Sequence, residues 1–362
     1  MKAQGCNQFQ RIHFTGLVES LANIPEVLFP DTQEVMIHKD RQGGVGGRHG
    51  SPSSMSLHRQ HSKLPPKEVF NDIMYIVGGW TQEDPSCPVE QFYPLENEWK
   101  NMASMVNHRG NVAVCGLYGK IYTVGGSDGV TYKSNVDRYD PQTNIWSNDV
   151  TPLSSPRSGV CLVEMDGYLY ALGGYDGMVC TNTVERYNPK MNSWTKQAPM
   201  LSRRCGAAAA VMEGQLYVIG GSDGDIPMNT VERFNPLDGI WYACPPMLTA
   251  RENAGCCVYL GRLFVTGGRD DLNLELSTAE KFDPDALRWT PVKHMRCKRN
   301  NMSLMVFNGS LLAVGGSDGV TNLKTIEVYN HESNTWRHFG SMKTKHPGGH
   351  VAMLNTKHGY SL

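Results

Sequence analysis

The 362-residue sequence predicts an all-β fold of six four-stranded antiparallel sheets, because three markers recur together six times. A pair of glycines returns every 47 or 48 residues, beginning at Gly78 and Gly79. A tryptophan follows the first glycine of each pair by 21 or 22 residues, from Trp99 to Trp336. Between them lies a Val-Glu-Arg-Tyr-Asn-Pro segment or a close counterpart, and only the sixth unit has another residue, His331, in place of the proline. Such units cannot bury their sheets alone and stack radially, which defines a six-bladed β-propeller.

Each unit is expected to contain four short strands. The first, residues 159–163 in the third unit, is almost wholly apolar and is predicted to be buried on both faces near the axis. The second, residues 120–124 in the second unit, is β-branched and aromatic and ends at the glycine pair. The third is the Val-Glu-Arg-Tyr segment, which alternates with period two and ends at proline. The fourth carries the tryptophan.

The glycine pairs predict that a bulky group approaches the end of the second strand. A glycine has no Cβ to block such an approach. The tryptophan ring is the group that we expect there.

The two ends of the repeated region predict how the ring closes. The first unit begins at its second strand, residues 73–77, with Pro65 and Pro66 where a first strand should lie. The last tryptophan is followed by an extra first-strand segment, residues 348–354. We therefore predict that residues 348–354 form the innermost strand of the first blade, which pairs otherwise exposed strand edges.

Residues 1–70 differ in kind, because they lack the repeat and include a Gly- and Ser-rich stretch at 43–54. Such composition does not bury a core. We expect a poorly structured N-terminal tail at 1–70 with one short helix at 17–29, a propeller at 71–355 and a C-terminal tail at 356–362.

The composition argues against several classes of partner, location and site. A formal net charge of -1 does not favour nucleic acid as a partner. The sequence has no apolar run long enough to span a membrane and no signal-peptide pattern, so a cytoplasmic location is expected. Ten cysteines without a C-x-x-C pair argue against a zinc site and a disulfide framework. Cys205 and Cys297 lie beside basic residues and could sense oxidants, the alternative being unreactive thiols. No cofactor is expected.

The glycine pair, the Glu-x-Tyr-x-Pro segment and the tryptophan, at a period near 47, resemble the kelch repeat from residue 73 to about 355. The resemblance implies a closed propeller that binds proteins, as in the BTB-BACK-kelch substrate adaptors of cullin ubiquitin ligases. The 70 residues before the repeats leave no room for BTB and BACK regions, so a cullin would be engaged only indirectly or through a missing BTB region. An actin-binding or cytoskeletal scaffold, located at the cytoskeleton, is the alternative function.

Enzymatic activity is not expected. Ser127-Asp128-Gly129 is superficially similar to the Asp-box of sialidases, but the same triplet follows other glycine pairs and suits a tight turn. A copper site of the galactose oxidase type needs converging Tyr and His ligands. Of the histidines, His108, His294 and His346 are the ones that could reach the central mouth.

The binding face is predicted from strand direction. Second-to-third and fourth-to-first loops should emerge on one face, where ligands usually bind. The fourth-to-first loops hold ten Lys or Arg and no acids, which predicts a basic mouth; they are residues 105–109, 153–157, 200–204, 247–251, 295–299 and 342–346. The second-to-third loops hold ten acids and three bases, which predicts an outer acidic ring. A basic mouth favours an acidic or phosphorylated peptide.

The candidate partner-binding residues form two groups. The first recurs with the repeat: Arg109, Arg157, Arg204, Arg251 and Arg299. These arginines could instead brace the blades against Asp137, Glu185, Glu232, Glu280 and Glu327. The second group lies off the repeat and offers the arginines and aromatics that usually anchor interfaces: Arg203, Arg269, Arg296, Lys298, Asp225, Trp80, Tyr132 and Tyr175.

Overall fold

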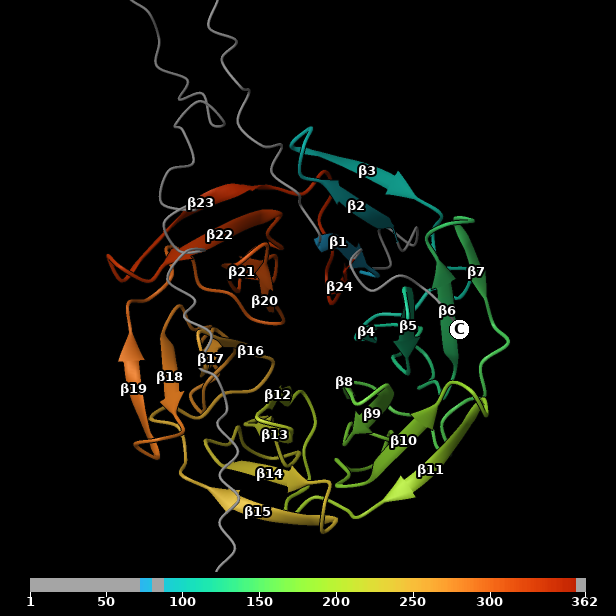
Figure 1. Ribbon diagram of the computed structural model, residues 1–362, viewed down its shortest axis with the longest axis horizontal. Helices are drawn as coiled ribbons and strands as arrows, with labels where there is room; N and C mark the ends of the chain where they lie inside the picture. The colour runs from blue at the N-terminus through green and yellow to red at the C-terminus, as the bar shows by residue number, and fades with distance from the viewer. Residues whose placement is uncertain (1–71, 80–87, 356–362) are drawn as a thin grey trace, which may run out of the picture. The chain divides into compact units, whose positions relative to one another are not determined.

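The computed structural model of the chain describes residues 72–79 and 88–355, which form six four-stranded antiparallel sheets around an axis (Figure 1). These residues contain 24 strands and no helix. The predicted six-bladed propeller is therefore confirmed. The tails expected at 1–70 and 356–362, and the helix expected at 17–29, lie outside the described residues. We number the sheets as blades 1 to 6 in chain order.

Each blade runs from the axis outward in the order first, second, third and fourth strand. Blades 1 to 3 consist of β24 (His350–Asn355), β1 (Asp72–Val77), β2 (Val89–Tyr93) and β3 (Glu98–Met102); β4 (Ala113–Leu117), β5 (Lys120–Val124), β6 (Val136–Asp140) and β7 (Ile145–Ser147); and β8 (Cys161–Met165), β9 (Tyr168–Leu172), β10 (Val184–Asn188) and β11 (Ser193–Gln197). Blades 4 to 6 consist of β12 (Ala208–Met212), β13 (Gln215–Ile219), β14 (Val231–Asn235) and β15 (Ile240–Cys244); β16 (Gly255–Tyr259), β17 (Arg262–Thr266), β18 (Ala279–Asp283) and β19 (Arg288–Val292); and β20 (Ser303–Phe307), β21 (Ser310–Val314), β22 (Thr325–Asn330) and β23 (Thr335–Ser341).

Two-residue turns join the first and second strands of blades 2 to 6. Each turn ends in glycine, and both of its residues have positive φ, as at Asp166 (54°) and Gly167 (79°). Such turns match the right-handed twist of paired strands, and glycine adopts positive φ without steric penalty. Local sequence therefore accounts for the innermost hairpin of these blades.

The second strand is the most buried strand of a blade, and the expectation that the first strand is buried on both faces is wrong. The last four residues of β9 and of β13 are all buried. In β8 and β12 buried residues are interrupted by half-buried ones and, in β8, by the exposed Glu164. The first strands line a central channel of about 480 Å³, so some of their side chains face open space.

The recurring tryptophan joins its blade to the preceding one. The Trp241 ring lies 5.3 Å from the Phe234 ring of its own blade, centroid to centroid, and its Nε1 donates to the Ala198 carbonyl at 2.9 Å. Trp146, Trp194, Trp289 and Trp336 repeat both contacts. Each indole N–H thus has a hydrogen-bond acceptor while the apolar ring packs against its own sheet.

The group that approaches the glycine pair is loop backbone, and the expectation of a tryptophan ring is wrong. The Gly174 N–H donates to the Arg204 carbonyl oxygen at 2.8 Å, and a Cβ on Gly173 would overlap that same oxygen. Arg204 belongs to the loop that enters the next blade. The same bond from the second glycine recurs at Gly126, Gly221 and Gly268. The glycine pairs therefore allow neighbouring blades to join through their backbones.

The ring closes as predicted, with a strand from the end of the chain completing blade 1. β24 pairs antiparallel with β1 from Asp72–Asn355 to Val77–His350. Figure 1 shows red β24 beside blue β1 at the inner side of the ring. Closure in this way removes an inner edge that could pair with another chain.

His350, at the start of β24, gives this closure a pH dependence. Burial lowers the pKa of His350 to about 4 from its ordinary 6.5. As pH falls below 6.5 the unfolded chain takes up a proton first, so the contribution of neutral His350 to stability is lost progressively down to about pH 4. We expect the melting temperature of the wild-type protein to fall more steeply across this interval than that of His350→Gln. Differential scanning fluorimetry at a series of pH values checks this, and parallel curves would contradict it.

Candidate partner-binding face

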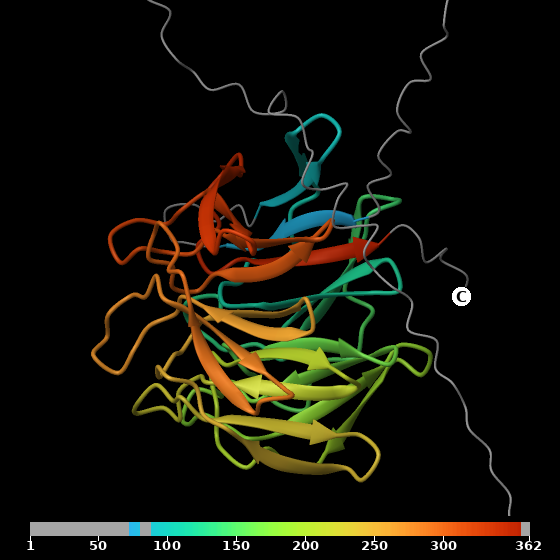
Figure 2. The ribbon, with the colours of Figure 1, turned by 60° about the vertical axis from the view of Figure 1, so that its left-hand side comes forward.

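The fourth-to-first and second-to-third loops lie on the same face, as predicted. The end of the first loop class pairs with the start of the second through isolated bridges, for example Ser158 with Tyr175 and Cys205 with Ser222. Figure 2, a side view, shows loops at the ends of the strands, with the orange loops reaching out on the left.

The five recurring arginines lie inside the blades, with 0–2% of each residue exposed. Arg299 donates to the carbonyls of Gly315 at 2.7 Å and Thr325 at 2.8 Å, and its guanidinium lies 3.0 Å from the Glu327 carboxylate. The equivalent ion pairs are Arg109–Asp137, Arg157–Glu185, Arg204–Glu232 and Arg251–Glu280. A ligand cannot reach these side chains, so all five leave the set of binding candidates. The bracing alternative describes them, and we call them the brace arginines.

The carboxylate of each brace also shapes the loop above it. The Glu280 carboxylate accepts the Leu248 backbone N–H at 2.7 Å, and Glu327 accepts those of Arg296 at 2.8 Å and Cys297 at 3.2 Å. Buried charges persist when they are paired and hydrogen-bonded in this way. The fourth-to-first loops are thereby held in one conformation before any ligand arrives.

Blade 1 has a histidine where the other blades have a brace arginine. His346 Nε2 lies 3.3 Å from the Glu90 carboxylate, and its Nδ1 lies 2.8 Å from the Gly78 carbonyl oxygen. Burial alone would raise the pKa of Glu90, but hydrogen bonds from His346, Thr344 and the Lys343 N–H lower it. Sequence reasoning missed this sixth brace because histidine replaces the repeated arginine. His346 is buried and does not line the mouth, which corrects the expectation that it could reach the mouth.

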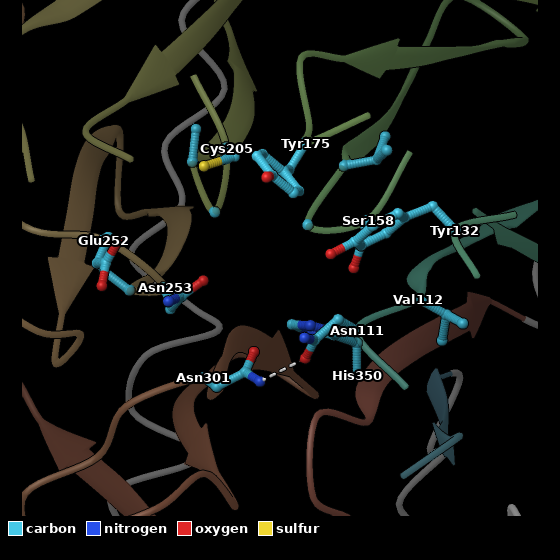
Figure 3. A pocket seen from close by; sticks show the side chains of 15 residues that line it. Asn111, Val112, Tyr132, Ser158, Tyr175, Cys205, Glu252, Asn253, Asn301 and His350 are labelled. Carbon is cyan, nitrogen blue, oxygen red and sulfur yellow. Dashed lines mark hydrogen bonds between the residues drawn. The ribbon is translucent and has the colours of Figure 1, made fainter. Parts of the chain in front are cut away.

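The centre of the face is a cavity of about 290 Å³, the mouth (Figure 3). Its rim carries one residue per blade, two positions after each brace residue, and all have positive φ: Asn111, Gly159, Gly206, Asn253, Asn301 and Gly348. Asn and Gly are the residues that tolerate this backbone conformation best. We call these six the collar.

Hydrogen bonds link the collar around the mouth. The Asn253 N–H donates to the Gly206 carbonyl at 2.7 Å, and the Asn301 N–H donates to the Asn253 carbonyl at 2.9 Å. Across the gap between Asn301 and Asn111 the side chains bond at 3.1 Å, drawn as the dashed line in Figure 3. The rim is therefore a neutral, ordered ring.

The expected basic mouth is wrong. No lysine or arginine is among the described residues that line the cavity. Five of the ten basic residues in the fourth-to-first loops are buried braces, and the exposed ones are Arg203, Arg296, Lys298, Lys343 and Lys345. The last four belong to the two loops that flank blade 6. We call Arg296, Lys298, Lys343 and Lys345 the basic patch; none of the four is among the residues that line the mouth.

The second-to-third loops carry aspartates that hold the loop backbone beneath apolar tips. Asp176 accepts the backbone N–H groups of Val179 at 2.9 Å and Met178 at 2.8 Å, and these bonds lower the pKa of Asp176. Asp128, Asp223, Asp270 and Asp318 hold their loops in the same way. The tips expose large apolar side chains at 58–95%: Val130, Met178, Ile226, Leu272 and Val320. Exposed apolar side chains gathered on one face favour a protein partner.

The other predicted residues have different positions. Tyr132 and Tyr175 both line the mouth, with ring centroids 5.4 Å apart in an edge-to-face arrangement. Arg269 is half-buried and bonds Glu275 at 3.2 Å. Arg203, Arg296, Lys298 and Asp225 are exposed on the loops but do not line the mouth. Trp80 lies outside the described residues.

Sequence reasoning missed Glu252, Ser158 and the collar asparagines, which line the mouth. The signal was available, because these positions directly follow the repeated arginine by one or two residues. It was overlooked because their residue types vary from blade to blade.

Cysteine pairing corrects another expectation. Cys180 and Cys205 form a disulfide with a Cα–Cα distance of 5.5 Å, although the sequence argued against a disulfide framework. The bond joins the second-to-third loop of blade 3 to the loop that enters blade 4. Cys205 is thus not a free thiol, whereas Cys297 is free. The spacing of cysteines along the chain did not indicate that these two loops meet.

Within residues 72–79 and 88–355, no group of three or more His, Cys, Asp and Glu side chains is arranged to hold a metal ion. In this same part of the chain, no helix has the length and hydropathy to cross a membrane.

A braced propeller with exposed loops around a mouth belongs to the class of protein-interaction modules. Residues 68–249 match the family model described as the KLHDC2/KLHL20/DRC7 Kelch-repeats domain, and residues 250–296 and 298–343 match the Kelch motif. The chain belongs to the kelch-repeat family, whose propellers generally bind proteins and do not catalyse reactions.

Several curated kelch-like proteins are similar to parts of the chain. Kelch-like protein 4 of Homo sapiens is 42% identical over 74 residues, covering 20% of this chain and 10% of that protein. Kelch-like ECH-associated protein 1A of Danio rerio is 34% identical over 102 residues (27% and 17%), and Kelch-like protein 21 of Homo sapiens is 38% identical over 89 residues (24% and 14%). The matches thus span less than a fifth of these relatives' own lengths.

A solved structure titled "Structure of YjhT" has a TM-score of 0.66 and 14% sequence identity, covering 75% of this chain and 95% of that chain. At this identity the likeness concerns the fold alone.

Proposed function

We propose that this chain is a non-catalytic recognition module that binds a segment of a partner protein on the mouth face. The observation that carries the proposal is the combination of loops held by buried braces with apolar tips exposed around an open mouth. Loops fixed in advance lose little conformational freedom on binding, and exposed apolar groups supply contact area.

The basic patch supports an acidic or phosphorylated segment as the ligand. Arg296, Lys298, Lys343 and Lys345 are exposed, and the backbones of Arg296 and Lys343 are held by Glu327 and Glu90. Arginine binds carboxylate or phosphate through two parallel hydrogen bonds. In this proposal one part of the segment contacts the patch and another enters the mouth beside Tyr132 and Tyr175. Arg203, Arg269 and Asp225 remain further candidate contacts.

The kelch-like relatives support a role as a substrate adaptor for ubiquitination in the cytoplasm. In this proposal the propeller holds the substrate, and the cullin ligase is engaged indirectly or through a BTB region outside this chain. An actin-binding scaffold at the cytoskeleton is the alternative, and co-sedimentation with F-actin at physiological salt distinguishes it.

Charge reversal of the basic patch tests the proposal. Peptides are selected with the wild-type chain from a random linear library, and dissociation constants are measured by isothermal titration calorimetry. We expect enrichment of acidic peptides and at least about a tenfold loss of affinity for Arg296→Glu/Lys298→Glu, because the reversed charges repel the ligand. The melting temperature should not change, since both side chains are exposed.

Lys190→Glu/Arg288→Glu is the matched control, because both residues are exposed near the third-to-fourth turns on the opposite face. Unchanged affinity in the patch variant would remove the acidic-ligand proposal. Failure to select any peptide, together with F-actin binding, would favour the scaffold.

A further inference from the structure

The charge of the mouth differs from that of the basic patch. Among the described residues that line the cavity, Glu252 is the single acidic or basic side chain other than His350. Burial lowers the pKa of His350 to about 4, so it is neutral at physiological pH. The mouth therefore contains one carboxylate and no cation of its own.

The Glu252 carboxylate differs from the brace carboxylates in its hydrogen bonding. Glu232 and Glu280 each hold a brace arginine and a loop N–H, whereas no described residue donates a hydrogen bond to the Glu252 side chain. Glu252 has an intermediate exposure, and burial raises its pKa while the charge of Arg269 opposes that rise. Arg269 itself bonds Glu275 at 3.2 Å. A cation that entered the mouth would add the hydrogen-bond donor that no described residue gives this carboxylate, beside the charge of Arg269.

The rest of the lining suits a long cationic side chain. Figure 3 shows Tyr132 and Tyr175 on one side of the mouth and Glu252 on the other, with Asn111 and Asn301 between them at the lower rim. Tyrosine faces attract guanidinium and ammonium groups, and amide oxygens accept their N–H bonds. The volume of about 290 Å³ lies just below the range of roughly 300–1,000 Å³ typical of small-ligand pockets.

We propose that the mouth binds a basic side chain of the partner segment, arginine in preference to lysine, through the Glu252 carboxylate, the Tyr132 and Tyr175 rings and the collar amides. Arginine is favoured because its planar group both stacks on aromatic rings and donates several hydrogen bonds in fixed directions. This inference rests on the proposed function. It adds that the ligand carries a basic residue for the mouth as well as acidic residues for the patch.

An anionic side chain in the mouth is disfavoured by the same observations. It would place like charge near Glu252, and no lysine or arginine of the described lining would compensate it. A neutral apolar side chain would leave the Glu252 carboxylate without a hydrogen-bond donor from the described residues or the ligand, which is unfavourable.

The test uses the peptides selected from the random library with the wild-type chain. We expect an arginine or lysine at one position of the enriched sequences. Replacing that arginine by citrulline, its neutral analogue of similar shape, should weaken binding about 10- to 100-fold, the range of a hydrogen-bonded charge pair. Glu252→Gln should weaken binding of the arginine peptide by a similar factor and leave the affinity for the citrulline peptide unchanged.

Glu332→Gln is the matched control, since it makes the same carboxylate-to-amide change on an exposed residue in the third-to-fourth turn of blade 6, on the opposite face. Selected peptides without a common basic residue, or equal affinity of wild type and Glu252→Gln for the arginine peptide, would overturn the inference while leaving the proposed function intact. If no peptide is selected, both fail together.

Discussion

Arg299→Met is expected to lower the free energy of unfolding by about 3–5 kcal/mol, because it leaves the buried Glu327 carboxylate without its cation. Methionine keeps much of the side-chain volume, so the loss reports mainly on charge and hydrogen bonding. The carbonyls of Gly315 and Thr325 lose their donor at the same time. Urea unfolding followed by tryptophan fluorescence measures the change.

Arg262→Met is the matched control for this brace. Arg262 lies 3.1 Å from Asp283, but its side chain is 34% exposed. Exposed ion pairs contribute about 0–1 kcal/mol, so the control should stay within that range. Equal effects of the two substitutions would show that the brace arginines are not structural.

Gly173→Ala is expected to destabilise the propeller by about 3–5 kcal/mol, through strain at positive φ and overlap with a fixed neighbour. Gly173 has φ 59°, and its new Cβ would overlap the Arg204 carbonyl oxygen of the following loop. That oxygen is itself held by the Gly174 N–H at 2.8 Å and cannot move aside without breaking the contact between blades. Chemical unfolding measures the loss.

Gly214→Ala separates the two causes. Gly214 also has positive φ, at 71°, but nothing lies within 4 Å of its added Cβ. The control should therefore lose about 1–2 kcal/mol from backbone strain alone. Equal losses in both variants would mean that the contact between blades does not contribute.

The binding face was predicted only in part. The direction of strands in a meander placed the two loop classes together, and Tyr132 and Tyr175 did meet at the mouth. Charge counting along the loops did not distinguish Arg251, which points into a blade, from Arg296, which faces solvent. Position within the repeat decides between them, because only the repeated position faces a carboxylate on the third strand.

The sequence by itself determined the number of blades, the order of their strands and the closing role of β24. Those features follow from local patterns, since each repeat carries the same turns, strand residues and tryptophan. Tertiary structure alone decided that the glycine pairs admit a neighbouring loop, that Cys180 meets Cys205, and that the described lining of the mouth carries the Glu252 carboxylate and no lysine or arginine. These depend on contacts between neighbouring blades, and a repeated pattern along the chain does not show which groups meet there.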